Sequence, residues 1–292
     1  MVGEDSGDGA PMTEHRSRDP SRHTAAGQQV EVPAVRKAVA IVRYLNGKAP
    51  AGATLRETAV NLAITNSHCH NILRTLIRYN WVGYDAASRR YRLQPGLCAD
   101  ALSAFSQFEP IVQLRPVVAQ LVAKVGITCI LTQVEPDGTF LVIDKADATN
   151  GFGVTVPIGH RFAADAPVQR KAVLAWQPEE VVEAWLERWM PIRHTSASIT
   201  DRAALLEDLA ATRARGYAVS REEYIVGVMS VGLPIFDRAA TPIMVLQCPA
   251  LIESLAAREH EVAEALQQAV ARAHALLGSR VPESFRLKPA DG

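Results

Sequence analysis

The chain has 292 residues, of which 48% are hydrophobic and 21% charged, and its formal net charge is zero. This composition is ordinary for globular protein, and the length allows two compact domains. No run of residues approaches the roughly 20 apolar residues of a membrane-spanning helix. The first thirty residues lack the apolar core of a signal peptide. We therefore expect a cytoplasmic protein without contact to a membrane.

The zero net charge hides an uneven distribution along the chain. Between residues 32 and 94, ten Lys and Arg residues are opposed only by Glu57 and Asp85, which gives +8. Residues 1–31 carry −3, and the rest of the chain carries −5. A basic segment joined to an acidic body indicates that one domain meets a polyanion and the other does not.

The basic segment follows residues 1–31, which are rich in Gly, Ser, Asp and Arg and predict a disordered tail. Apolar spacing predicts a helix that begins at Pro33. Thr54 is a suitable N-cap for a second helix over 55–62, and a third follows from residue 66 to about Tyr79. In the corner between them, Ala63 stands where glycine is more usual.

Alternating apolar and polar residues on either side of residues 85–88 predict a β-hairpin directly after the third helix. Asn80 is the expected left-handed terminator of that helix. Three helices followed by a basic hairpin are typical of a winged helix-turn-helix, which we assign to residues 32–94.

The remainder predicts a linker helix over 95–108, a second domain over 109–280 and a tail over 281–292. Strands are expected at 127–134, 139–144, 153–157, 229–236 and 242–248. Helices are expected at 111–125, 168–176, 179–189, 201–215 (with Thr200 as N-cap) and 254–277. This pattern predicts an α/β (α+β) fold with a mixed sheet flanked by helices.

The third helix has the side chains that a DNA recognition helix needs. Asn can bind adenine and Arg can bind guanine through paired hydrogen bonds, whereas Ser67 could hold a phosphate or merely cap the helix. Arginines on the hairpin suit the phosphate backbone or the minor groove. The candidate DNA-binding residues are Arg36, Lys37, Arg56, Asn66, Ser67, His68, His70, Asn71, Arg74, Arg89 and Arg90.

Several segments together resemble the IclR family of bacterial regulators. They are Val35–Ile41, Tyr91–Gly96, Arg215–Val219, Glu222-Glu223 and Pro234–Asp237. The resemblance implies a winged helix joined by a linker helix to a GAF-like effector-binding domain. It also implies double-stranded DNA with a palindromic operator, a small-molecule effector such as a metabolite or organic acid, and homodimers that pair into tetramers.

The family's effector-site motifs are altered in this chain. The segment that usually reads Thr-Ala-x-Gly-Lys-Ala is residues 167–172 here, and Arg170 replaces its glycine. Arg170 could pair with a ligand carboxylate, with Asp165 or with a surface glutamate. By position, the candidate effector-binding residues are Val168, Gln169, Ser220, Ser230 and Gln247. The alternative is a domain that only oligomerises, with these residues at ordinary core-edge positions.

The sequence contains no catalytic or cofactor-binding motif that we identify, so we expect neither an enzyme nor a cofactor. His160, Arg161 and Asp165 are the one group that could suggest acid–base chemistry. The triplet 68–70 (His-Cys-His) predicts no metal site, because helical neighbours face different directions. The four cysteines form no C-x-x-C pair, which favours buried free thiols.

Overall fold

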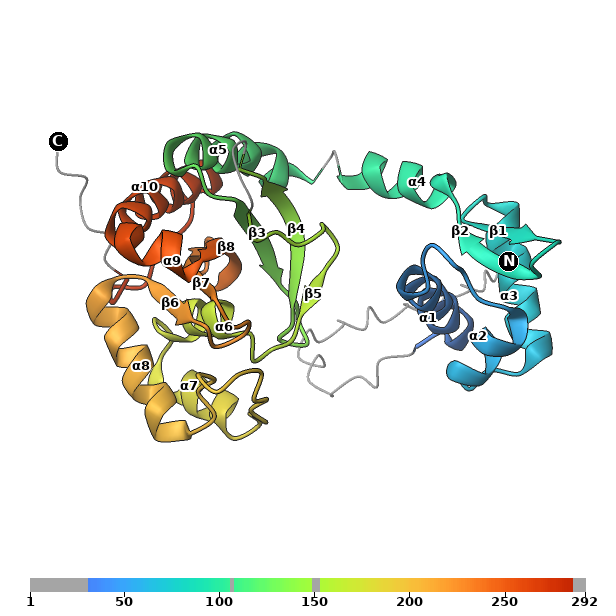
Figure 1. The fold of residues 1–292 in the computed structure, drawn as a ribbon, viewed down its shortest axis with the longest axis horizontal. Helices are drawn as coiled ribbons and strands as arrows, with labels where there is room; N and C mark the ends of the chain where they lie inside the picture. Colours follow the sequence, from blue (N-terminus) through green and yellow to red (C-terminus); the bar gives the residue numbers. More distant parts are fainter. Residues whose placement is uncertain (1–30, 106–107, 149–152, 286–292) are drawn as a thin grey trace, which may run out of the picture. The chain divides into compact units, whose positions relative to one another are not determined.

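The computed structural model describes residues 31–105, 108–148 and 153–285, which form two compact units divided after Asp100 (Figure 1). The tail expected over 1–31 lies outside these residues except for Glu31, and residues 286–292 lie outside them as well. Within the described ranges, no helix is both long and apolar enough to cross a membrane.

The N-terminal unit begins with three helices, α1 (Pro33–Gly47), α2 (Leu55–Asn61) and α3 (Asn66–Arg78). Helix α2 begins with a capping box in which Thr54 and Glu57 exchange side-chain and backbone hydrogen bonds. The corner between α2 and α3 is made by Ala63 in a left-handed conformation, φ 50°. In this conformation an alanine is less favourable than a glycine by about 1 kcal/mol.

The hairpin follows α3 at once, because Asn80 (φ 56°) turns the chain out of the helix. Strand β1 (Val82–Asp85) pairs antiparallel with β2 (Arg90–Leu93). Asp85 closes the turn by accepting the backbone N–H groups of residues 87 and 88. Tyr91 on β2 packs into the three-helix core with Ile41 and Leu73, so the hairpin is held by apolar burial. Helix α4 (Pro95–Phe105) comes next.

The C-terminal unit is built on one six-stranded sheet in the order β5-β4-β3-β8-β7-β6. The strands are β3 (Cys129–Val134), β4 (Phe140–Ala146), β5 (Arg161–Phe162), β6 (Ala218–Arg221), β7 (Val228–Phe236) and β8 (Pro242–Leu251). The expected class, a sheet flanked by helices, is confirmed. The expectation of a mixed sheet is wrong, however. Among the described strands of this sheet, each pairing is antiparallel.

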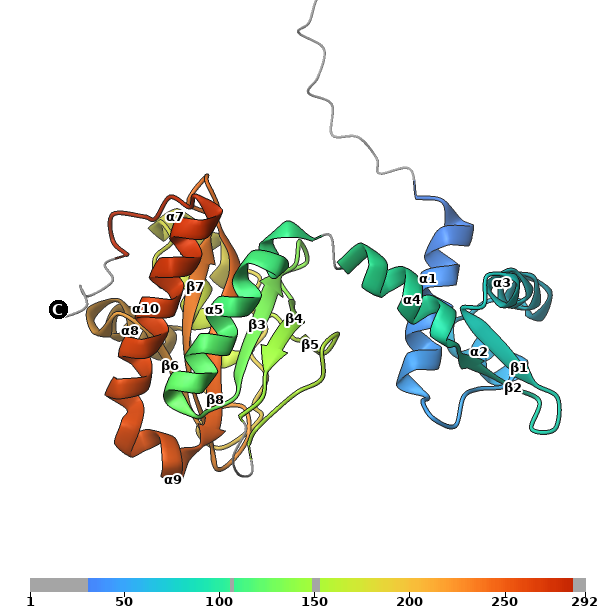
Figure 2. The same ribbon diagram turned by 90° about the horizontal axis from the view of Figure 1, so that it is seen from above.

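Two long helices cover one face of this sheet. Figure 2 shows α5 (Glu109–Val125) and α10 (Glu259–Leu277) side by side on it. Helix α6 (Pro167–Leu174) packs on strands β6, β7 and β8 from the other face. Helices α7 (Glu179–Leu186), α8 (Arg202–Arg215) and α9 (Ile252–Leu255) complete the unit.

Side chains alternate between the two faces along each strand, and this decides what faces α6. On β8, Leu246 and Cys248 join the core beneath α5 and α10, whereas Val245 joins Val168 of α6. On β7, a Cβ at Gly232 would lie 2.8 Å from the Val168 side chain. The missing side chain therefore lets α6 approach the sheet closely.

Several expected elements, such as the helix over 179–189, differ only by a few residues at their ends, whereas three differ in other ways. Residues 153–157 form no strand, because the backbone of Val142 on β4 bonds to residues 159 and 160 instead. Helix α8 is capped by Asp201, not Thr200, since the Asp201 carboxylate accepts the N–H of residue 204 at 2.9 Å. The long helix expected from 254 is α9, a 3-10 turn and then α10. Acidic residues in its first turn favour the start of α10 at Glu259.

The sequence predicts a tail from residue 281, but the chain after α10 stays packed against the unit as far as Phe285. Phe285 is 4% exposed and packs edge-on against Trp176 and Phe236, with ring centroids 4.9 and 5.1 Å away. His274 of α10 belongs to the same cluster. An aromatic ring supplies enough apolar area to fix this segment against the core.

Candidate nucleic-acid interface and ligand pocket

Helix α3 has one buried and one exposed face. Four apolar side chains point into the core, those of Cys69, Ile72, Leu73 and Leu76. On the other face, Ser67, Asn71 and Arg74 are exposed and follow one another at helical spacing. Asn66 and His70 are exposed beside them, and His68 is half-buried. The geometry thus brings the predicted α3 residues to one hydrogen-bonding surface.

Ser67 is not needed to cap this helix. The N-cap is Thr65, whose hydroxyl accepts the N–H of His68 at 3.4 Å. The Ser67 hydroxyl is exposed at the first turn, where backbone N–H groups also face outward. Thr65 therefore caps the helix in place of Ser67. The exposed Ser67 hydroxyl is available to contact an anion such as a phosphate.

Arg90 has a different environment from the one expected of a phosphate-binding residue. Its Nη1 donates to the Gly52 carbonyl at 2.9 Å and to Glu57 Oε2 at 3.2 Å. Hydrogen bonding to the Thr54 backbone, together with the charge of Arg90, holds the pKa of Glu57 below its ordinary value. The Arg90 side chain therefore links the hairpin to the start of α2, and its charge is already offset.

The remaining basic candidates lie on three elements. Arg89 is exposed in the hairpin turn with φ 53°. Arg56 is exposed on α2, while α1 carries an exposed Arg36 that pairs with Glu31 at 3.1 Å, and a half-buried Lys37. Of the two predicted hairpin arginines, Arg89 is thus the better placed for a backbone phosphate.

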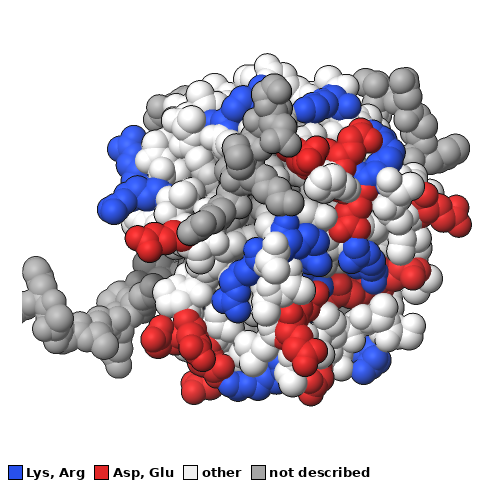
Figure 3. Space-filling view, turned by 90° about the vertical axis from the view of Figure 1, so that its left-hand side faces the viewer, with Lys and Arg blue, Asp and Glu red and all other residues white. Residues whose placement is uncertain are grey.

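The charge pattern of the C-terminal unit is unlike that of the basic segment. Figure 3 shows one face of this unit, on which Lys and Arg alternate with Asp and Glu. Neighbouring opposite charges screen one another, so such a face attracts polyanions weakly. Positive charge is therefore more concentrated along residues 32–94 than on this face of the C-terminal unit.

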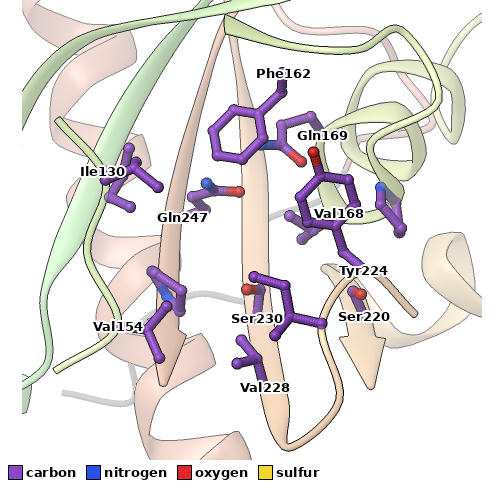
Figure 4. A pocket seen from close by; sticks show the side chains of 14 residues that line it. Ile130, Val154, Phe162, Val168, Gln169, Ser220, Tyr224, Val228, Ser230 and Gln247 are labelled. Atoms are coloured by element: carbon purple, nitrogen blue, oxygen red, sulfur yellow. The ribbon is translucent and has the colours of Figure 1, made fainter. Parts of the chain in front are cut away.

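A pocket opens on the α6 face of the sheet, and all five predicted effector residues line it (Figure 4). Val168 and Gln169 come from the first turn of α6. Ser220 on β6 and Ser230 on β7 are directly paired in register, and Gln247 comes from β8. The side-chain alternation of the strands aims these residues at α6, away from α5 and α10.

The polar groups of the pocket are neutral. No Lys, Arg, His, Asp or Glu is among its lining residues. Gln247 is 3% exposed, and its Oε1 has no hydrogen-bond partner among the described residues. The N–H groups of the first turn of α6 have no helical carbonyl to bond. The pocket can therefore both donate to and accept from a small polar ligand.

Sequence reasoning missed the apolar wall of this pocket. Phe162 on β5 and Tyr224 line the pocket with ring centroids 5.9 Å apart, and in Figure 4 both rings lie beside Gln169. Ile130 of β3 adds to this wall. Only the Glu222-Glu223 pair directly before Tyr224 could have drawn attention to it.

The pocket volume is about 60 Å³. A water molecule needs roughly 10–15 Å³ measured in this way, so the space suits a compound of about five non-hydrogen atoms. A larger ligand would require the walls to move. The size therefore favours a small metabolite.

Of the partners that the sequence left open, Arg170 contacts Asp165, but through the backbone carbonyl and not through the carboxylate. Its guanidinium donates to the Asp165 backbone carbonyl at 3.2 Å and lies 5.1 Å above the Trp189 ring. It is 3% exposed and does not line the pocket, and burial lowers its pKa. Replacing the usual glycine by arginine thus builds a contact behind α6 instead of blocking the ligand side.

The other groups considered from the sequence do not converge. Arg161 pairs with Glu135 at 3.0 Å, whereas His160 packs edge-on to Phe162. Among the described residues, no three His, Cys, Asp or Glu side chains gather as metal ligands would. Three of the four free cysteines are buried as expected, but Cys98 is exposed.

Residues 103–274 match the family model described as the bacterial transcriptional regulator IclR C-terminal domain. A curated relative, the HTH-type transcriptional regulator BhcR of Paracoccus denitrificans, is 32% identical over 189 residues. That match covers 64% of this chain and 67% of the relative.

Solved structures repeat this likeness. An IclR transcriptional regulator from Alicyclobacillus acidocaldarius has a TM-score of 0.78 and 28% identity, covering 85% of this chain and 100% of that one. An IclR homologue from Microbacterium hydrocarbonoxydans, solved with 4-hydroxybenzoate, has a TM-score of 0.70 at 18% identity. It covers 84% of this chain and 99% of that one, and at this identity shows the fold alone.

Proposed function

The chain belongs to the IclR family of bacterial transcriptional regulators, and from this premise we propose that it binds specific DNA under the control of a small molecule. The observation that best supports this proposal is that the two units carry different kinds of site. An exposed polar and basic helix lies in one unit, and a pocket with unpartnered polar groups lies in the other. No catalytic step is part of this function.

In this proposal α3 enters the major groove of double-stranded DNA. Asn71 and Arg74 contact base edges, and Asn66, His68 and His70 extend the same surface. The DNA phosphates are held by residues from all three helices and the hairpin turn, which are Ser67, Arg89, Arg56, Arg36 and Lys37. Two copies related by two-fold symmetry would place their helices on a palindromic operator, with half-sites about one helical turn apart. A homodimer is the smallest assembly that fits, and pairs of dimers give a tetramer.

The effector binds in the pocket between α6 and strands β6, β7 and β8. We propose a small organic acid or similar metabolite, whose oxygens accept from Gln247 Nε2, the serine hydroxyls and the first-turn N–H groups of α6. A helix N-terminus favours negative charge, which offsets the lack of a cationic side chain. An IclR homologue solved in complex with 4-hydroxybenzoate supports the choice of an organic acid, and a ligand of that size would require the walls of this pocket to move. We place the protein in the cytoplasm, where DNA and metabolites meet.

The test is a titration of the full-length protein into fluorescent DNA from the intergenic region beside its own gene. Saturable binding that an unrelated duplex does not match supports DNA recognition. A thermal-shift screen of small organic acids then identifies the effector, because a ligand bound only by the folded state raises the melting temperature. Equal affinity for all duplexes would contradict the proposal.

The small pocket volume favours one alternative, a C-terminal unit that only oligomerises. Under this alternative no metabolite raises the melting temperature or changes DNA affinity. The unit would still associate, and the operator would still be bound. The two screens above therefore separate the alternatives.

A further inference from the structure

The C-terminal unit has a second cavity, separate from the pocket described above. It lies between the β3–β4 turn at residues 136–138, residues 163–165 before α6, and residues 185–192 at the end of α7. Its volume is about 420 Å³, against about 60 Å³ for the first pocket. Ligand sites in proteins commonly measure roughly 300–1,000 Å³, so this cavity has the size of a binding site.

One part of the cavity wall is aromatic and apolar. Trp185 and Trp189 have ring centroids 5.7 Å apart and an interplanar angle of 31°. Met190 and Ile192 also line the cavity and are 84% and 52% exposed. A solvent-accessible wall of two indoles and a thioether is a surface that gains free energy when a flat apolar ring covers it.

Three buried polar atoms without partners in the described part of the chain belong to residues in or beside the wall of this cavity. Among the described residues, Asp165 Oδ1, Trp189 Nε1 and Arg170 Nε are buried and have no hydrogen-bond partner. The last two are donors and the first is an acceptor. They belong together, because Arg170 donates to the Asp165 carbonyl and lies over the Trp189 ring. Asp165, only 5% exposed, and Trp189 both line the cavity.

We propose that this cavity is a second small-molecule site, which takes a neutral aromatic alcohol of the phenol class. The ring packs against Trp185 and Trp189, and the hydroxyl accepts from Trp189 Nε1 and donates to Asp165 Oδ1. A hydroxyl can satisfy a donor and an acceptor at once. Arg188 lines the cavity together with Asp137 and Asp165, so the charged groups there are of both signs, and the hydroxyl is selected by hydrogen bonding.

The site differs from the effector pocket in the ligand that it can hold. A six-membered ring exceeds the small first pocket but fits the second. The proposal also stands without the DNA-binding function, since it concerns only binding to the C-terminal unit. The two can therefore fail separately.

The test is isothermal titration calorimetry of the full-length protein with phenol, toluene and benzoate. We expect saturable binding of phenol and weaker binding of toluene and benzoate, which both lack the hydroxyl. Trp189→Phe keeps a ring beneath Arg170 but removes the indole N–H. We expect it to weaken phenol binding about tenfold, near the upper end for one hydrogen bond. Circular dichroism should show that Trp189→Phe is folded, so that the change is one of ligand binding.

Two further variants locate the site. Ala164→Leu places a larger side chain in the cavity wall and should abolish phenol binding. Gln247→Leu alters only the first pocket and should leave phenol affinity as in the wild type. The proposal is overturned if phenol gives no saturable heat, if Trp189→Phe and Ala164→Leu both bind phenol normally, or if Gln247→Leu is the variant that loses it.

Discussion

Lys171 Nζ lies 2.6 Å from Glu223 Oε1, and both side chains are buried. The same ammonium reaches Asp208 at 2.7 Å and the Val219 carbonyl at 2.9 Å. One lysine on α6 therefore ties this helix to α8, to β6 and to the loop that leads to Tyr224. Since Val168, Ser220 and Tyr224 all line the first pocket, the ion pair fixes its walls from behind.

Lys171→Met should destabilise the protein by about 3–5 kcal/mol, because it leaves two carboxylates without their cation. The double variant Lys171→Met/Glu223→Met should recover a large part of this loss, since it removes most of the uncompensated buried charge. Urea unfolding followed by circular dichroism measures both. Lys145→Met is the control: its partner Asp147 is 52% exposed, so we expect a loss below about 1 kcal/mol. Additive effects of the two changes at Lys171 and Glu223 would contradict this account.

Asn71→Ala should relax the base preference of the protein. An amide facing a base edge discriminates by about 1–3 kcal/mol, so the preferred base at one operator position should lose that advantage. Fluorescence anisotropy with single-base operator variants measures this. Asn46→Ala, exposed at the end of α1, is the matched control and should keep the preference. An unchanged preference in Asn71→Ala would place base readout on other residues of α3.

Arg89→Ala should weaken binding to all sequences alike and lower the salt dependence by about 0.9 in the slope of log K against log salt. A phosphate contact carries no base information, which is why the preference should stay. Arg90→Ala should act differently, by loosening the hairpin from Glu57 and Gly52 and lowering stability by about 1 kcal/mol. A change of preferred sequence in Arg89→Ala would show that the turn reads bases.

The winged helix could be predicted closely because its signals are local. Thr54 and Asn80 mark helix ends by their own chemistry, and Asp85 marks the turn. The role of Arg90 could not be predicted in this way. Its partners Gly52 and Glu57 lie 38 and 33 residues away, so only the folded topology brings them together.

The C-terminal unit was harder to predict for two physical reasons. Strands β5 and β6 have two and four residues, which is too short for an alternating pattern to stand out. Thr200 and Asp201 are adjacent and can both cap a helix, so sequence alone cannot choose between them. The polar pocket residues were found through family positions, whereas Tyr224 and Phe162 reach the pocket through tertiary packing.

His274 should make the protein less stable in mild acid. Burial lowers its pKa from 6.5 to about 4, and its Nε2 accepts the N–H of Phe236 at 3.2 Å. The unfolded chain binds the proton at a higher pH than the native state does. Stability is therefore lost as pH falls from about 6.5 toward 4, by on the order of 2–3 kcal/mol. Urea unfolding at both ends of this range should show a smaller pH dependence for His274→Gln. An equal dependence would mean that other groups cause the acid loss.

Ser230→Phe should abolish the response to the effector and leave DNA binding without effector nearly unchanged. Ser230 lies on β7 and lines a pocket of about 60 Å³, which a phenylalanine ring fills. An effector changes DNA affinity only through its different affinities for two conformations of the protein. Filling the pocket removes this difference and leaves the basic residues of the N-terminal unit unchanged.

DNA titrations with and without effector measure the response, and Ser254→Phe, exposed on α9, is the matched control. A folded Ser230→Phe protein that still responds would place the effector elsewhere. One that no longer binds DNA without effector would show that β7 itself maintains the DNA-binding state.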